Sequence, residues 1–269
     1  MTLPDRTRAV VTGAGGGLGR AFCLELAKRG ARIVVSDIRP EAAEETATLV
    51  RSAGAEAHAV ACDVSRAAEV ELLATEAETL LGGTDLLVNN AGVAVSGPVG
   101  EVSLADWTWI MGINLWGVIH GCHAFVPRMK KQKGGHVINV ASAAGLLSAP
   151  GMGPYNVTKA GVVALSETLY GELLPLGLGV TVLCPTFFKT DIVKSGRGGD
   201  EGLKAIAEKR MDRSKIQADD VARIALDAAD AGKLYALPQA DGRWMWRVKR
   251  VAPQMFHTQA AKVAQRMMK

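Results

Sequence analysis

The stretch Thr12-Gly13-Ala14-Gly15-Gly16-Gly17-Leu18-Gly19 follows a short β-branched segment and leads directly into an apolar segment of helical period. Glycines let a backbone turn sharply and approach a pyrophosphate closely, and the free N–H groups at the start of a helix favour its negative charge. We therefore predict a dinucleotide-binding turn in which Gly13, Gly15, Gly17, Leu18 and Gly19 bind the cofactor. A plain glycine turn between a strand and a helix is the alternative interpretation.

An acidic residue, Asp37, ends the next predicted strand, about 20 residues after the glycine turn. At this spacing a carboxylate commonly receives the ribose hydroxyls of NAD. Its charge would repel the 2′-phosphate of NADP, and Gly16 leaves the turn without a basic residue. Arg39 is close enough in sequence to swing toward such a phosphate. NAD is therefore the predicted cofactor, with NADP as the alternative.

Short apolar runs alternate with longer segments of helical period along the chain. This alternation predicts an α/β fold: a single-domain, doubly wound (Rossmann-type) parallel sheet with helices on both faces. The expected strands are 9–12, 32–36, 57–62, 85–89, 135–141, 180–183 and 234–237. The expected helices are 18–29, 40–52, 66–81, 104–131, 155–174 and 218–231.

No repeat or low-complexity linker divides the chain, so residues 1–241 are predicted to form one dinucleotide-binding and catalytic domain. Within it, residues 186–215 are rich in Gly, Lys and Arg, and we expect a mobile substrate lid beside the carboxyl edge of the sheet. Residues 242–269 form a basic tail that contains Trp244 and Trp246. We expect this tail to pack on the substrate cleft or on a second subunit, in preference to peripheral contact with a membrane.

The composition fits a globular protein with a sizeable core, because 48% of the 269 residues are hydrophobic and 22% are charged. A net charge of +4 is mild and does not point to nucleic acid. Four scattered cysteines predict neither a zinc site nor disulfides, and they favour a cytoplasmic location. We find no signal peptide and no stretch long enough to cross a bilayer, so neither secretion nor membrane insertion is expected.

Tyr155 and Lys159 stand four residues apart and therefore share one face of a predicted helix. A cation beside a tyrosine in a partly dry site would lower the phenol pKa from about 10 toward working pH. Such a pair can act as a general acid and base on an alcohol or a carbonyl. The same spacing also occurs by chance as a surface pair. Ser142, at the carboxyl end of the preceding strand, favours the catalytic interpretation.

Taken together, these motifs resemble the short-chain dehydrogenase/reductase family over residues 8–192. The glycine turn is similar to the family's TGxxxGxG turn, and Tyr155 with Lys159 is similar to its catalytic pair. The other matching segments are Cys62-Asp63-Val64, Asn89-Asn90-Ala91-Gly92, Ile113-Asn114-Leu115, Ser142, and 184–190 with Pro185 and Thr190. Thr186 stands where the family usually has glycine.

The resemblance implies hydride exchange between a nicotinamide and a carbinol or carbonyl carbon. Tyr155 would exchange the substrate proton, and Ser142 would hydrogen-bond the substrate oxygen. Lys159 would lower the tyrosine pKa and bind the nicotinamide ribose, while Asn114 would hold a helix kink and a relay water. The remaining cofactor contacts that the resemblance implies are Asp63 and Val64 at the adenine, Asn90, Ala91 and Gly92 beside the cofactor, and Pro185 and Thr190 at the carboxamide.

Apolar residues are expected to line or flank the substrate cleft: Val93, Val95, Ala143, Ala144, Leu146, Leu147, Met152, Phe187 and Phe188. They favour a hydrophobic secondary alcohol or ketone, so we predict an NAD-dependent alcohol dehydrogenase or ketone reductase. The alternatives are an NADPH-dependent carbonyl or 3-oxoacyl reductase and an NAD-sensing regulator without chemistry.

A homo-oligomer is expected, with a homodimer ahead of a homotetramer, because the chain lacks the Val-Asp-Gly-Gly ending common in tetrameric relatives. His120 and His123 have a spacing that can chelate a metal, but no third ligand is evident and no metal is expected.

Overall fold

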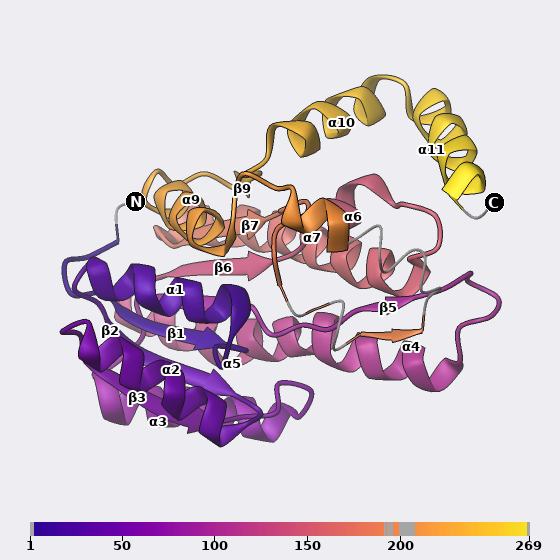
Figure 1. Cartoon of the computed structure of the whole chain (residues 1–269). Coiled ribbons are helices and arrows are strands. Elements are labelled where there is room, and N and C mark those ends of the chain that lie inside the picture. The colour runs from indigo at the N-terminus through magenta and orange to yellow at the C-terminus, as the bar shows by residue number, and fades with distance from the viewer. Residues whose placement is uncertain (1–2, 191, 193–195, 199–207, 268–269) are drawn as a thin grey trace.

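A computed structural model describes residues 3–190, 192, 196–198 and 208–267 (Figure 1). Seven parallel strands form one sheet in the order β3-β2-β1-β4-β6-β7-β9. These strands are β1 (Arg8–Thr12), β2 (Arg32–Asp37), β3 (Ala57–Ala61), β4 (Leu86–Asn89), β6 (His136–Val140), β7 (Gly179–Leu183) and β9 (Tyr235–Ala236). They are the seven strands expected from the sequence, and the doubly wound α/β prediction is confirmed.

Helices cover both faces of the sheet because successive strand residues point to opposite sides. Val11 of β1 belongs to a core shared with α1, α2 and α9, whereas Val10 belongs to a second core shared with α3, α5 and α7. The helices are α1 (Gly17–Lys28), α2 (Pro40–Ser52), α3 (Ala67–Leu81), α4 (Leu104–Met111), α5 (Gly117–Gln132), α7 (Gly153–Leu173) and α9 (Ala218–Asp230), with a short 3-10 turn, η2 (Leu174–Leu176), after α7. The sheet edge where the strands end is left open between the two layers.

The predicted helix over 104–131 is α4 and α5 joined by one π-helical segment, η1 (Gly112–Trp116). The expectation that no stretch could cross a bilayer was wrong for this part of the chain. Among the described residues one helical stretch, Leu104–Gln132, is long and apolar enough by length and composition, and half of its apolar window is buried inside the protein. Phe125 and Met129 pack into the core beneath the sheet. Such burial is typical of a core helix.

Several short elements were not predicted. They are β5 (Val95–Ser96), β8 (Arg197–Gly198) and α6 (Ala143–Leu147). β5 pairs in parallel with β8, and Gly97 bridges to Met152, so three distant segments form a small roof above the carboxyl edge of the large sheet. The predicted lid over 186–215 falls partly on residues 191, 193–195 and 199–207, which lie outside the described residues.

The basic tail forms two helices, α10 (Ala240–Val251) and α11 (Pro253–Met267), which follow the last strand and stand apart from the sheet (Figure 1). α10 packs on α6, where Lys249 Nζ donates to the carbonyl of Leu146 at 2.6 Å. The ring of Trp246 lies 4.9 Å from that of Tyr235. α11 packs against α10. The predicted domain boundary after residue 241 falls inside α10 and stays a prediction.

Candidate active site

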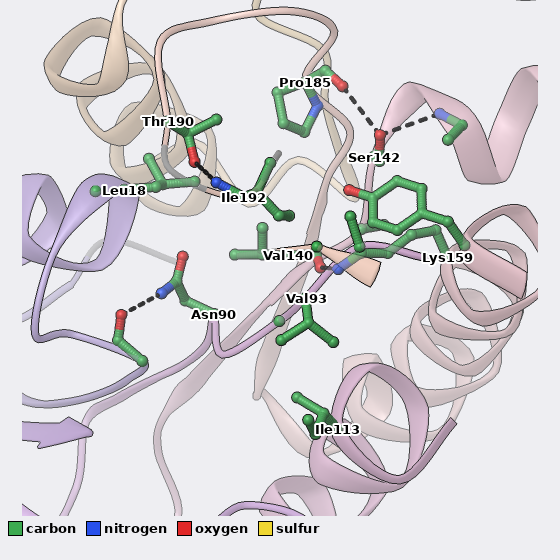
Figure 2. A pocket seen from close by; sticks show the side chains of 18 of the residues that line it. Leu18, Asn90, Val93, Ile113, Val140, Ser142, Lys159, Pro185, Thr190 and Ile192 are labelled. Carbon is green, nitrogen blue, oxygen red and sulfur yellow. Dashed lines mark hydrogen bonds between the residues drawn. The ribbon is translucent and has the colours of Figure 1, made fainter. Parts of the chain in front are cut away.

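A cavity of about 790 Å³ lies at the carboxyl ends of the central strands (Figure 2). Its volume is in the range of small-molecule sites, roughly 300–1,000 Å³. The structure brings the predicted site residues to this cavity from the ends of six strands, β1, β2, β3, β4, β6 and β7, and from α7. The exceptions are Gly15 and Asn114, which lie behind its wall.

The glycine turn has two kinds of position. At Gly19 a Cβ atom would lie 2.3 Å from the carbonyl oxygen of Gly13, and at Gly13 it would lie 2.6 Å from Cα of Ala91. Both glycines therefore let backbone segments touch. Gly16, in contrast, faces open space and precedes the first turn of α1, which has no acidic residue and no side-chain cap. The free N–H groups of that turn fit an anion such as a dinucleotide phosphate.

Asp37 ends β2 beside the turn and holds it in place. Its Oδ2 accepts the N–H of Gly15 at 2.9 Å, and its Oδ1 accepts the N–H of Arg39 at 3.1 Å. The guanidinium of Arg39 lies 3.4 Å from the same carboxylate, and its side chain is 69% exposed. Asp37 lines the cavity, and its three hydrogen bonds leave acceptor capacity for a ribose hydroxyl.

The predicted cofactor residues after β3 and β4 also face the cavity. Asn90 is fixed by Thr12, whose Oγ1 accepts the N–H of Asn90 at 3.0 Å and that of Ala91 at 3.2 Å. The amide of Asn90 in turn donates to the carbonyl of Thr12 at 2.8 Å. Thr12 was quoted in the turn, but its role in joining β1 to β4 was missed. Asp63 accepts two bonds from Ser65, at 2.9 and 2.7 Å, and lines the cavity together with Val64.

Ser142 caps the short helix α6 at the end of β6. Its Oγ accepts the N–H of Ala144 at 3.1 Å and donates to the carbonyl of Pro185 at 3.4 Å (Figure 2). This bond ties β6 to the segment after β7, which carries Pro185 and Thr190 at the cavity. Thr186 contacts the start of α10: its N–H donates to Oε1 of Gln239 at 3.0 Å, and its Oγ1 donates to Oδ1 of Asp241 at 3.3 Å.

Tyr155 and Lys159 project from the first turns of α7 into the same cavity. The Nζ of Lys159 is buried and donates to the carbonyl of Val140 at 2.8 Å, and it lies 5.8 Å from the centre of the Tyr155 ring (Figure 2). Burial lowers the pKa of Lys159 to about 8. The expected lowering of the Tyr155 pKa is not found in this structure. Burial raises that pKa and outweighs the opposite effect of the Ser142 hydroxyl.

Asn114 lies in the π-helical segment and is fully buried. Its Oδ1 accepts the N–H of Val93 at 2.8 Å, and its Nδ2 donates to the carbonyl of Val93 at 2.9 Å. The side chain thus pairs with a backbone segment as a neighbouring strand would. A Cβ at Gly92 would lie 3.3 Å from Oδ1 of Asn114 and 3.6 Å from Nζ of Lys159. The missing side chain at Gly92 therefore keeps the space between these two groups open.

The substrate end of the cavity is largely apolar. Of the predicted lining residues, Val95 and Leu146 are instead buried in or beneath the wall, because β5 pairing and the packing of α6 turn them away. Sequence reasoning missed several residues that line the cavity, among them Arg197, Arg210 and Met245. A two-residue strand and a tail helix leave no pattern that would have assigned them.

Of the two histidines His120 and His123, His120 makes a structural contact. The Nδ1 of His120 lies 2.9 Å from the carbonyl oxygen of Val64, and its ring lies 5.8 Å from that of Trp116. Within the described ranges, no three His, Cys, Asp or Glu residues gather where they could hold a metal ion.

Comparisons with known proteins agree with this geometry. Residues 7–200 match the family model described as short chain dehydrogenase. A crystal structure of a short-chain dehydrogenase/reductase from Burkholderia phymatum in complex with NAD is 36% identical, with a TM-score of 0.87 over 95% of this chain and 96% of that one.

Curated relatives are similar at a comparable level. The probable oxidoreductase EphD of Mycobacterium tuberculosis is 32% identical over 94% of this chain, which spans only 44% of that longer protein. The 3-oxoacyl-[acyl-carrier-protein] reductase FabG of Staphylococcus epidermidis is 32% identical over 82% of this chain and 92% of that protein.

Proposed function

Because the chain belongs to the short-chain dehydrogenase/reductase family, we propose that it transfers a hydride between NAD(H) and an apolar secondary alcohol or ketone. One observation carries the proposal: Ser142, Tyr155 and Lys159 line the same cavity as the glycine turn and Asp37. A site with these groups together can bind a dinucleotide at one end and exchange a proton with a substrate oxygen at the other.

The chain supplies the proton chemistry and the positioning. When bound, the nicotinamide would supply or accept the hydride. Tyr155 exchanges a proton with the substrate oxygen, and its raised pKa keeps the hydroxyl protonated at neutral pH, the form that donates to a ketone. Ser142 hydrogen-bonds the same oxygen. Lys159 holds its ammonium near the phenol and favours the phenolate that forms when Tyr155 gives up its proton.

Asn114 acts on the site through other residues. By pairing with Val93 it fixes the segment after β4 against the π-helical turn, and it donates to Oγ1 of Thr158 at 3.4 Å on α7. Thr158 lies between Tyr155 and Lys159 along the chain. These contacts support a positioning role for Asn114, and the relay water implied by the family resemblance stays a prediction.

NAD is the proposed cofactor because the Asp37 carboxylate lines the cavity at the end of β2, where its charge would repel the 2′-phosphate of NADP. The Burkholderia structure, which carries NAD, agrees with this choice. The ion pair of Arg39 with Asp37 supports NADP as the alternative, because it offsets part of the negative charge. Similarity to the FabG reductase keeps a 3-oxoacyl reductase as the second candidate.

The test begins with fluorescence titration of the protein with NADH and NADPH, followed by a panel of secondary alcohols and ketones. Tyr155→Phe is expected to lower kcat by roughly 10²–10⁴-fold while leaving the Kd for NADH unchanged. Tyr170→Phe is the matched control, since Tyr170 lies on the same helix outside the cavity. Full activity of Tyr155→Phe would refute the proposed mechanism.

The alternatives give different results in the same experiment. Cofactor binding without turnover of any compound in the panel would favour the NAD-sensing regulator. Tighter binding of NADPH, with turnover of 3-oxoacyl thioesters, would favour the reductase. Asp37→Asn is expected to raise the ratio of kcat/KM for NADP to that for NAD, and an unchanged ratio would remove Asp37 from cofactor selection.

The predicted homodimer and the cytoplasmic location stay predictions. Light scattering of the purified protein measures the first, and fractionation of cells measures the second.

A further inference from the structure

Among the residues that the structure describes, α10 packs against the rest of the protein with one of its faces. Gly242 is buried, Met245 reaches the substrate cavity, and Lys249 binds the carbonyl of Leu146. These positions follow helical spacing, so they mark one side of the helix. On the other side, Trp244 is 65% exposed and Val251 is 87% exposed.

The charge of the chain is concentrated in the same two helices. Their sequence, residues 240–267, holds six Lys and Arg and one Asp, a net charge of +5, whereas the whole chain carries +4. The rest of the protein is therefore slightly negative, at −1. Arg247 and Arg250 are exposed on α10. Arg247 is three residues from Trp244 and four from Val251, so it neighbours both on the helix surface, and Arg250 lies over the ring of Trp246 at 5.3 Å.

The apolar surface continues along α11. Met255 is 56% exposed and Val263 is 45% exposed, and the described contacts of α11 are with α10. An exposed stripe with tryptophan, flanked by arginines, is the pattern of a helix that lies in a membrane interface. Indoles suit the headgroup region, and each cation near an anionic surface adds to the attraction.

We propose that α10 and α11 attach the protein to the surface of an anionic lipid bilayer, with Trp244 and Val251 among the headgroups and Arg247 and Arg250 on lipid phosphates. Other polyanions would be attracted by the same arginines. They would gain nothing from exposed Val251, Met255 and Val263, which a bilayer would cover.

Attachment through this face would place the bilayer beside the cavity. Met245 lines the cavity from the inner side of α10, whereas Trp244 and Val251 on the other side are exposed, so the same helix would contact both the cavity and the bilayer. An apolar substrate dissolved in the bilayer would then reach the site over a short path. This last point rests on the proposed function, whereas the attachment does not.

The experiment is sedimentation of the full chain with vesicles of phosphatidylcholine, alone or mixed with phosphatidylglycerol, at low and at high salt. We expect binding to the anionic vesicles that weakens with salt. Trp244→Ala and the double variant Arg247→Gln with Arg250→Gln should each bind less, the double variant by roughly tenfold or more. NADH titration of every variant, compared with the unmodified protein, checks that the fold is kept.

Matched controls change similar residues elsewhere. Leu72→Ala removes an apolar side chain on α3 that is 61% exposed. The double variant Lys130→Gln with Lys131→Gln removes two exposed charges from the end of α5, at the opposite edge of the sheet. Both controls should bind vesicles as the unmodified protein does.

Three results would overturn the proposal. The first is no binding to anionic vesicles, and the second is equal binding of the α10 variants and the controls. The third is that the unmodified protein does not bind vesicles and is an oligomer in light scattering, and that Trp244→Ala dissociates this oligomer. That result would make this face a contact between copies of the chain.

Discussion

Replacing His136 by Gln should remove most of the dependence of stability on pH between pH 5 and pH 8. His136 begins β6 and is 1% exposed. Its Nε2 lies 2.9 Å from Oγ1 of Thr181, and that hydroxyl donates to the carbonyl of Lys233 at 2.8 Å. The Thr181 oxygen is therefore an acceptor for Nε2–H. Nδ1 has no partner, so a proton added there would be buried without a hydrogen bond.

The size of this stability change follows from how His136 is protonated in the folded and in the unfolded protein. Burial lowers the pKa of His136 from 6.5 to about 4 in the folded protein. The unfolded chain then binds more protons than the folded one as pH falls below 6.5, so stability is lost on acidification. The loss should be about 2 kcal/mol between pH 8 and pH 5, and about 3 kcal/mol once the pH reaches 4.

Urea unfolding, followed by tryptophan fluorescence at fixed protein concentration, measures this loss. Carboxylates with lowered pKa act at lower pH: Glu56, for example, has its pKa lowered to about 2 by Arg32 and His58, so its contribution is lost below about pH 4.5. His123→Gln, at an exposed histidine, is the control and should keep the full slope. If the free energy of unfolding of His136→Gln changed with pH as much as that of the unmodified protein does, the reasoning from burial would be refuted.

Three further predictions concern the site. Gly19→Ala should weaken NADH binding at least tenfold, because its Cβ would meet the Gly13 carbonyl at 2.3 Å, whereas Gly171→Ala, with open space around it, should bind normally in the same titration; equal affinity would argue against the close approach. Asn114→Leu should lower the free energy of unfolding by about 2–4 kcal/mol, because both backbone groups of Val93 lose their partners, and unchanged urea unfolding would contradict this. Met245→Trp should raise KM for bulky ketones more than for small ones, and a change that is independent of substrate size would place Met245 outside the substrate end.

The sequence was most informative where local chemistry and long-range structure agree. The glycine turn, Asp37 and the Tyr155 and Lys159 pair each have a fixed spacing from a strand or helix end. Parallel strands bring those ends to one edge, so residues distant in sequence could be placed in one site. All seven strands of the large sheet were found for the same reason.

Features that depend on packing in three dimensions were not predictable. The two-residue strands β5 and β8 are too short for alternation to show, so the roof of the cavity and Arg197 were missed. The direction of the Tyr155 pKa shift was wrong because spacing places the ammonium nearby but does not give its distance. In the structure Lys159 is bound to Val140, and burial of the phenol dominates.

Helix α6 contacts both the tail and the catalytic end of the cavity. Ser142 forms its N-terminal cap, and Lys249 of α10 binds the carbonyl of Leu146 near its C-terminal end. A helix of five residues bends little, so α6 keeps the distance between its contact with the tail and the serine hydroxyl nearly fixed. A shift of α10 would therefore be transmitted to the position of Ser142 Oγ. One short helix thus contacts both the tail and the serine of the proposed site.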